Sequence, residues 1–371
     1  ALAFVGEMAG KRARRQTRKN IVAPVSHHQR VFRARAKDNA GNTQDVFANG
    51  ISSNTFTYNT AVPTIGITAP SQPRRSDLST LAGTATDAIP TSLAKVLVRV
   101  LRQTGINLFA DPAPGVHAFS LDPATLAESA WFDAASVSVP LWTNWTLSSG
   151  LPYVSGETYR VEARVLNQAG TYSTTYSTQT TIYDTEAPYT DVLLPVAFST
   201  VSALPQITGT SYDLPLGNGG VVSNIRMRLT RLTDGQYWAG AGWTPLVTQM
   251  TTSEGLKVHV SSWTMATNLP PANNNPVTGL QSGVSYYMSV SGVDDASPAG
   301  TAEAFNSELK SSTFTVDLIG ATAGFTAPSD LSVISTLAKI RGTATDALAG
   351  VTAAGQIEIA IAETSPVGGC W

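Results

Sequence analysis

The sequence predicts an all-β protein built from tandem antiparallel two-sheet sandwiches with Greek-key connections. Three observations predict this fold class. Helix signals are nearly absent, apolar and polar residues alternate along many short segments, and one set of motifs recurs three times at the spacing of a whole domain. Short strands bounded by Gly, Pro, Asn and Asp are typical of β-sandwiches.

The repeat starts with an extended, proline-containing link and ends on a strand that closes with Asp. Its copies read NTAVPTIGITAP…GTATD at 59–87, DTEAPYTDVLLP…GTSYD at 184–213 and DLIGATAGFTAP…GTATD at 317–346. The copies begin 125 and 133 residues apart, which is too long for a solenoid turn and right for a domain. We therefore expect complete domains at 60–184 and 185–317.

Alternating segments occupy the same place in successive repeats, just after the GTATD-type strand. They are 96–100 (VLVRV), 225–229 (IRMRL) and 357–361 (IEIAI). A second common strand leads into an Asn/Asp–Ala–Gly turn at 38–42, 167–170 and 294–300. The pattern predicts strands that each bury one face.

The two ends of the chain carry only parts of a repeat. Residues 1–59 hold its late strands and 318–371 its early ones, with Trp371 in the place of Trp238. A half-sandwich leaves an apolar face and a strand edge open. Two explanations remain: the chain is a window on a longer array, or the end of one copy is completed by the start of the next, head to tail, to form a fibre.

Composition limits the classes of function. Charged residues make up 13% of the chain and the net charge is −2, which argues against a nucleic-acid partner. No apolar run is long enough to span a membrane, and no signal peptide follows Ala1. Cys370 is the only cysteine, so hydrophobic cores must hold the domains without internal disulfides.

Three stretches carry a family resemblance: GTATD, FRARAKDNAGN (32–42) and DGQYWAGAGW (234–243). They resemble the bacterial Ig-like repeats of large cell-surface proteins. The resemblance implies tandem Ig-like sandwiches in an extracellular stalk, adhesin or filament, with copies of itself as head-to-tail or lateral partners. It implies no catalytic residue, and we expect no enzyme, because neither a G-x-S-x-G elbow nor a Cys–His pairing is present.

Aspartates at strand ends and junctions are candidate ligands for calcium, which would stiffen the array. The candidates are Asp184, Asp213, Asp294 and Asp317. Aspartate is also a common turn residue, no dense DxDxD loop is present, and Asn59 stands where the other junctions have Asp. The sequence therefore leaves open a chain without any cofactor.

Aromatic residues in the middle loops support a second function. Tyr237, Trp238 and Trp243 could stack on a surface glycan or anchor a protein partner, or they could pack in the core. The basic stretch Lys11–Lys19 with His27 and His28 could hold a metal or a polyanion, but adjacent histidines on a strand point to opposite faces, so we expect a solvated loop. We expect a structural stalk or filament protein, with a glycan-binding adhesin module as the alternative.

Overall fold

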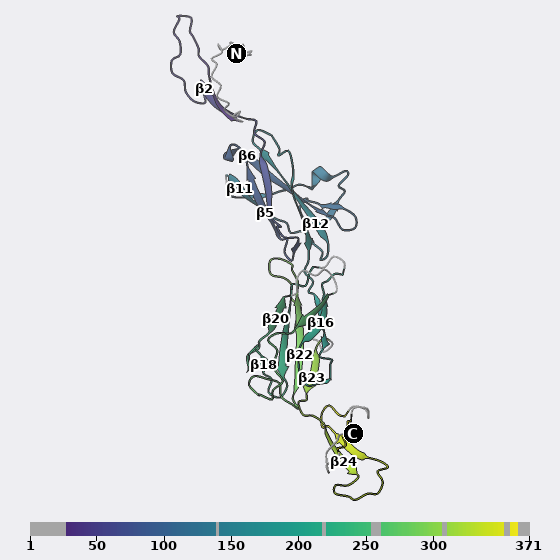
Figure 1. The fold of residues 1–371 in the computed structure, drawn as a ribbon. Coiled ribbons are helices and arrows are strands. Elements are labelled where there is room, and N and C mark those ends of the chain that lie inside the picture. The colour runs from purple at the N-terminus through teal and green to yellow at the C-terminus, as the bar shows by residue number, and fades with distance from the viewer. Residues whose placement is uncertain are drawn as a thin grey trace, which may run out of the picture.

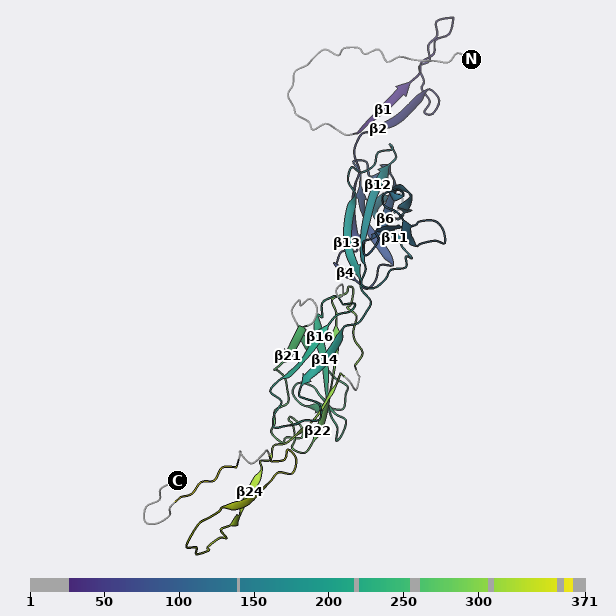
Figure 2. The ribbon, with the colours of Figure 1, turned by 90° about the vertical axis from the view of Figure 1, so that its right-hand side faces the viewer.

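The computed structural model describes residues 27–138, 141–216, 220–253, 261–305, 310–351 and 357–362. Within these ranges the chain is all-β, with two complete sandwiches lying end to end and one hairpin beyond each of them (Figures 1 and 2). The stretch Lys11–Lys19 and Trp371 lie outside the described residues, whereas His27 and His28 begin strand β1 (His27–Arg33), so the expected loop is wrong for these two residues. No helix in the described ranges has the length and apolar character needed to cross a membrane.

The domain 60–184 consists of two sheets. The first has the order β10 (Ala135–Ser138), β11 (Leu141–Ser148), β5 (Thr80–Thr86) and β3 (Thr64–Ala69). The second has the order β4 (Arg74–Arg75), β13 (Ser177–Tyr183), β12 (Thr158–Asn167), β6 (Leu93–Arg102), β7 (Leu108–Ala110) and β8 (Phe119–Leu121), and β9 (Phe132–Asp133) also pairs with β6. Two 3-10 turns, η1 (Pro90–Ser92) and η2 (Ala127–Ala130), lie in its loops. The chain leaves the first sheet after β5 and again after β11, so that β11 pairs with β5 and β12 with β6; such pairing of non-consecutive antiparallel strands is a Greek-key connection.

The domain 185–317 repeats this plan. One sheet has the order β14 (Tyr189–Leu194), β16 (Ile207–Tyr212) and β21 (Ser261–Met265). The other has the order β15 (Thr200–Val201), β23 (Ser312–Val316), β22 (Ser285–Val293), β17 (Asn224–Arg231), β18 (Tyr237–Trp238) and β19 (Trp243–Thr244), and β20 (Met250–Ser253) pairs with β17.

The core of each domain is built by the predicted alternation. Val96, Val98 and Val100 on β6 are fully buried, and so are the alternating residues of β17. A tryptophan from the neighbouring strand packs over the glycine of each GT motif. A Cβ on Gly83 would lie 2.3 Å from the Trp145 ring, and Gly209 stands in the same relation to Trp263. The glycine of the motif is therefore required by close packing between strands.

Strand β6 departs from the predicted pattern, because its outer face is also covered. Arg99 is buried, and its Nε donates to Glu162 Oε2 at 2.6 Å. Its guanidinium also lies over the rings of Trp131 and Tyr176. The prediction of one buried face is wrong here, since an ion pair and a loop with aromatic side chains close the second face.

The terminal hairpins are β1 (His27–Arg33) with β2 (Ser53–Asn59), and β24 (Thr322–Ala327) with β25 (Arg341–Thr345). The second has the register and the irregularity of the β3–β5 pair. Both hairpins leave large apolar side chains open to solvent, including Phe32 at 60% and Phe325 at 68% exposed. The predicted strand at 357–361 is not formed, because the described chain gives it no partner strand.

Candidate cation centre at the junction of the complete domains

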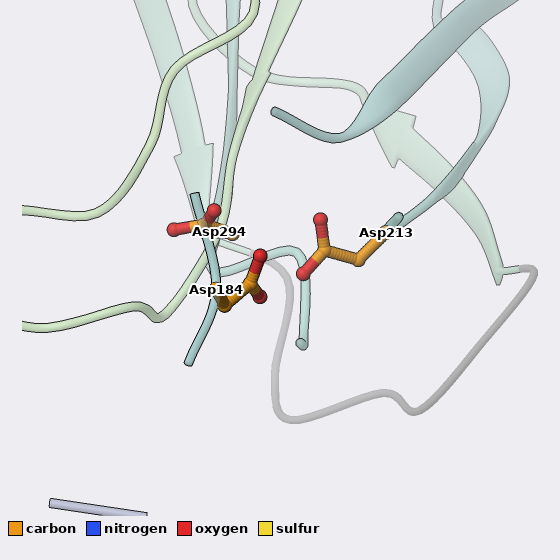
Figure 3. Close-up of side chains that lie close together, drawn as sticks. All are labelled: Asp184, Asp213 and Asp294. Atoms are coloured by element: carbon orange, nitrogen blue, oxygen red, sulfur yellow. The ribbon is translucent and has the colours of Figure 1, made fainter. Parts of the chain in front are cut away.

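Three aspartates meet where the two complete domains join. Asp184 follows β13 of the first domain, and Asp213 and Asp294 follow β16 and β22 of the second. Figure 3 shows the three carboxylates facing one another, and one oxygen of each lies within 4.8 Å of the others. Strands that end at one edge of the second sandwich, together with the incoming link, thus bring together residues far apart in sequence.

Each of these carboxylates uses only one oxygen for hydrogen bonds to the backbone. Oδ1 of Asp184 accepts from Glu186 N, Oδ1 of Asp213 from Leu214 N at 3.0 Å, and Oδ1 of Asp294 from the N–H groups of Ala296 and Thr301. Within the described part of the chain, Oδ2 of all three is buried and has no hydrogen-bond partner. The residues are only 0%, 3% and 2% exposed, so water does not reach them freely.

Burial of like charges shifts the ionisation of the centre. Burial, followed by repulsion from Asp294, raises the pKa of Asp184 to about 6. Burial and the charges of Asp184 and Asp294 raise the pKa of Asp213 to about 7, although N–H groups of Leu214 and Gly220 act in the opposite direction. Burial also raises the pKa of Asp294. Ionised carboxylates in such a place need a compensating positive charge.

A fourth carboxylate and a glycine complete the surroundings. Asp295 Oδ1 accepts from Val221 N at 3.0 Å, and its Oδ2 lies 3.4 Å from Arg74 Nη1 of the preceding domain. A Cβ on Gly220 would lie 2.3 Å from Asp213 Oδ2, 2.7 Å from Asp295 Oδ1 and 3.1 Å from Asp184 Oδ2. The missing side chain therefore leaves room beside the unpartnered oxygens.

The donor set identifies the class of ion that would fit. All available ligand atoms are carboxylate oxygens, which suit hard divalent cations rather than zinc or copper. Calcium takes six to eight oxygens, so three aspartates would supply part of the shell and water or carbonyl groups the rest.

Asp317, the fourth aspartate that the sequence predicted as a calcium ligand, is not part of this centre. It lies at the following junction, where its Oδ1 accepts from Ile319 N at 3.0 Å and its Oδ2 from Ala349 N at 3.1 Å. Both oxygens therefore have backbone partners. Sequence reasoning also passed over Gly220 and Arg74, and gave Asp295 no role of its own, although its place directly after Asp294 was a visible signal.

The aromatic candidates are placed mainly by the core. Trp238 is 2% exposed and donates its Nε1–H to Asn268 O, which favours the core-packing alternative for this residue. Trp243 is half-buried, donates to Gly279 O at 2.9 Å and stacks on Tyr286. Tyr237 is half-buried next to them.

Comparison with known proteins finds no matching family model and no match among curated proteins. Among solved structures, the chain is similar to a tetra-tandem repeat in the extending region of a large adhesion protein, with 14% identity and a TM-score of 0.27 over 81% of this chain and 58% of that one. Fibronectin(III)-like modules of Clostridium thermocellum CbhA match with 12% identity and a TM-score of 0.30 over 68% of this chain and 94% of that one. Chicken CNTN1 FN1–FN3 domains match with 12% identity and a TM-score of 0.24 over 69% and 66%. The chain spans 58% of the length of the adhesion-protein structure. The strand pairing of the chain itself carries the fold assignment.

Proposed function

We propose that this chain is a structural spacer of an extracellular stalk or adhesion protein, in which small β-sandwiches are held end to end. The observation that carries the proposal is the direct backbone pairing between the complete domains. Ser76 N donates to Ser297 O at 2.8 Å, and Ser297 N donates to Arg74 O at 3.2 Å. A spacer needs such a joint, because a flexible linker would let neighbouring domains fold back on each other.

Other contacts support the same joint. Thr185 N in the link donates to Ser155 Oγ of the first domain at 3.0 Å. Pro215 of the second domain lies so close to Gly156 that a Cβ on this glycine would meet it at 2.2 Å. The link between β13 and β14 is therefore short and held from both sides. The extracellular location rests on the resemblance of the repeat motifs and is part of the proposal.

Single-molecule stretching of the whole chain tests the spacer role. We expect two separate unfolding events, each releasing about 40 nm of chain, because about 120–130 residues extend by about 3.5 Å each and the folded length is subtracted. Small-angle scattering should give an extended particle. A single event of twice that length, or a compact globular profile, would contradict an array of independent domains.

A second candidate is head-to-tail assembly, which the open faces of the terminal hairpins favour. The β24–β25 hairpin corresponds to β3–β5, and β1–β2 corresponds to β12–β13. In the complete domain, β3 contacts both β12 and β13. We infer that the β24–β25 hairpin of one copy packs against the β1–β2 hairpin of a second copy. Each hairpin would then cover the apolar face of the other.

Concentration-dependent light scattering of the whole chain tests this assembly. We expect particles that grow with concentration, and Phe325→Ser should reduce their size because it removes an apolar side chain from the open face. Leu126→Ser, at an exposed position of a complete domain, is the matched control. A monomer at every concentration would exclude assembly through the hairpins and leave the spacer role untouched.

A further inference from the structure

We propose that the joint between the two complete domains is fixed by a bound divalent cation of the calcium class at Asp184, Asp213 and Asp294, whereas the preceding joint is fixed without a cation. The inference concerns the chemistry of the two joints and does not require the spacer role. It rests on a comparison of the same place in two consecutive repeats of one chain.

The preceding joint has the same backbone arrangement as the cation centre. Asn59, Asp87 and Asn167 stand where the later joint has Asp184, Asp213 and Asp294. Oδ1 of Asn59 accepts from the second residue after it, as Oδ1 of Asp184 does. Oδ1 of Asp87 accepts from the next residue, as Oδ1 of Asp213 does. Asn167 and Asp294 each accept from the threonine that ends their turn.

The two joints differ in the second atom of each side chain. At the first joint, Oδ2 of Asp87 accepts from Asn59 Nδ2 at 3.1 Å, Asn167 Nδ2 at 3.2 Å and Ser92 Oγ at 2.7 Å. One carboxylate is thus surrounded by three neutral donors, and the joint is satisfied by the protein alone.

At the second joint both amide donors are replaced by carboxylates. No described residue forms a hydrogen bond with the corresponding oxygen, Asp213 Oδ2, or with Oδ2 of Asp184 and Asp294. Among the described residues, the basic side chain that ion-pairs beside this cluster is Arg74, which reaches Asp295 and not the three Oδ2 atoms. Three buried acceptors that converge without a donor are the arrangement that a cation completes.

The cation centre is connected to the interdomain contact through one loop. Asp294 holds the turn 294–301 by accepting from Ala296 N and Thr301 N. Ser297 of the same turn forms the backbone pairing with Arg74 and Ser76 of the preceding domain. At the first joint the turn 167–171 is shorter, and its Gln168 donates to Ser92 O and Thr91 O within its own domain. Ion binding should therefore order the second joint specifically.

Calorimetric titration of the chelator-treated whole chain with Ca²⁺ is the binding test. We expect one Ca²⁺ site per chain that fills first, at a lower Ca²⁺ concentration than any weaker site on the chain. The variant Asp184→Asn with Asp294→Asn should lose at least tenfold in affinity while keeping its fold, because it restores the donor set of the first joint. The matched control, Asp317→Asn, should bind as the parent does.

The outcomes separate the alternatives. If the parent binds no Ca²⁺ up to millimolar concentration, the carboxylates share protons and the proposal is wrong. If binding survives in the double variant and disappears with Asp317→Asn, the ion belongs to the following junction and the assignment is equally wrong.

Distance measurements between spin labels test the effect on each joint. With Cys370→Ser as background, labels at Thr178 and Thr264 span the second joint, and labels at Thr57 and Thr178 span the first; all three threonines are exposed. We expect chelation to broaden the 178–264 distribution and to leave the 57–178 distribution unchanged. Equal behaviour of both pairs would overturn the proposed difference between the joints.

The reverse exchange gives an independent test. Asn59→Asp with Asn167→Asp places three carboxylates at the first joint, and we expect a second Ca²⁺ site per chain and a 57–178 distribution that now broadens on chelation. A variant that folds but gains no site would show that the carboxylates alone do not make the centre.

Discussion

Replacing Gly220 by alanine tests the cation centre without removing any of its charges. The new methyl group would lie 2.3 Å from Asp213 Oδ2, whereas ordinary contacts start at 3.4 Å, so this carboxylate must retreat by about 1 Å. Ligand distances in a metal site tolerate about 0.2 Å. Asp213 should therefore cease to be a ligand.

We expect Gly220→Ala to weaken Ca²⁺ binding by about 10–100-fold, or about 1.4–2.7 kcal/mol. Titration calorimetry gives the affinity, and thermal unfolding with chelator checks that the domain still folds. Gly320→Ala is the control, because a Cβ there meets nothing within 4 Å and neither glycine has a left-handed φ. Unchanged affinity in Gly220→Ala, or equal losses in both variants, would refute the reasoning.

Three further predictions concern the domains themselves. Glu162→Gln removes the buried charge partner of Arg99, which keeps only the 4.0 Å pair with the more exposed Glu128, and should cost about 3 kcal/mol, lowering the melting temperature of domain 60–184 by about 10 °C; an apolar pair at positions 99 and 162 should recover most of this loss in calorimetry. Met227→Asp should unfold domain 185–317 alone, and loss of both calorimetric transitions would show that the domains are not independent. Trp243→Ala should destabilise domain 185–317 by about 3 kcal/mol in urea unfolding without changing glycan-array signals, since its ring packs on Tyr286; a loss of glycan signals in the folded variant would restore the binding role.

Local pattern was sufficient to predict the parts of the fold in which each strand buries one face. The alternation on β6 and β17 places their core residues correctly. It could not show that Arg99 is buried, because this depends on Glu162 and on an aromatic loop that is distant in sequence. The short strands β4 and β15, which pair in parallel with β13 and β23, were also missed, since two residues carry no periodicity.

The candidate site was predictable residue by residue but not as an assembly. The repeat places Asp184, Asp213 and Asp294 at strand ends, and the Greek-key path then brings these ends to one edge. The same reasoning predicted Asp317 as a ligand, but its two carboxylate oxygens accept hydrogen bonds from backbone N–H groups at another junction. Spacing fixes where a carboxylate lies along its strand, whereas its partners are fixed by the strands that surround it.

The asparagine at position 59 can be interpreted only together with Asn167. Taken alone, an asparagine at the first junction argues against a ligand position in the repeat. In the structure the two amides donate to Asp87, so the exchange of Asp for Asn is paired, and hydrogen bonds take the place of the ion that we propose at the second joint. Repeats with the same backbone arrangement can therefore differ in the interactions that hold their joints rigid.

The same comparison extends to the terminal hairpins. Asp317 and Asp346 occupy the first two positions of the centre at the third junction. The third position corresponds to Asp38 in the turn after β1, whose Oδ1 accepts from Asn42 N at 2.8 Å and whose N–H donates to Asn42 O at 2.9 Å, as in the turn that starts at Asn167. Completion of one hairpin by the other would thus bring three carboxylates together, but Asp38 Oδ2 already accepts from Asn42 Nδ2 at 2.8 Å and Asp317 Oδ2 from Ala349 N at 3.1 Å. Two of the three second oxygens thus have donors from the protein itself, so we expect head-to-tail assembly to depend less on a cation than the second joint does.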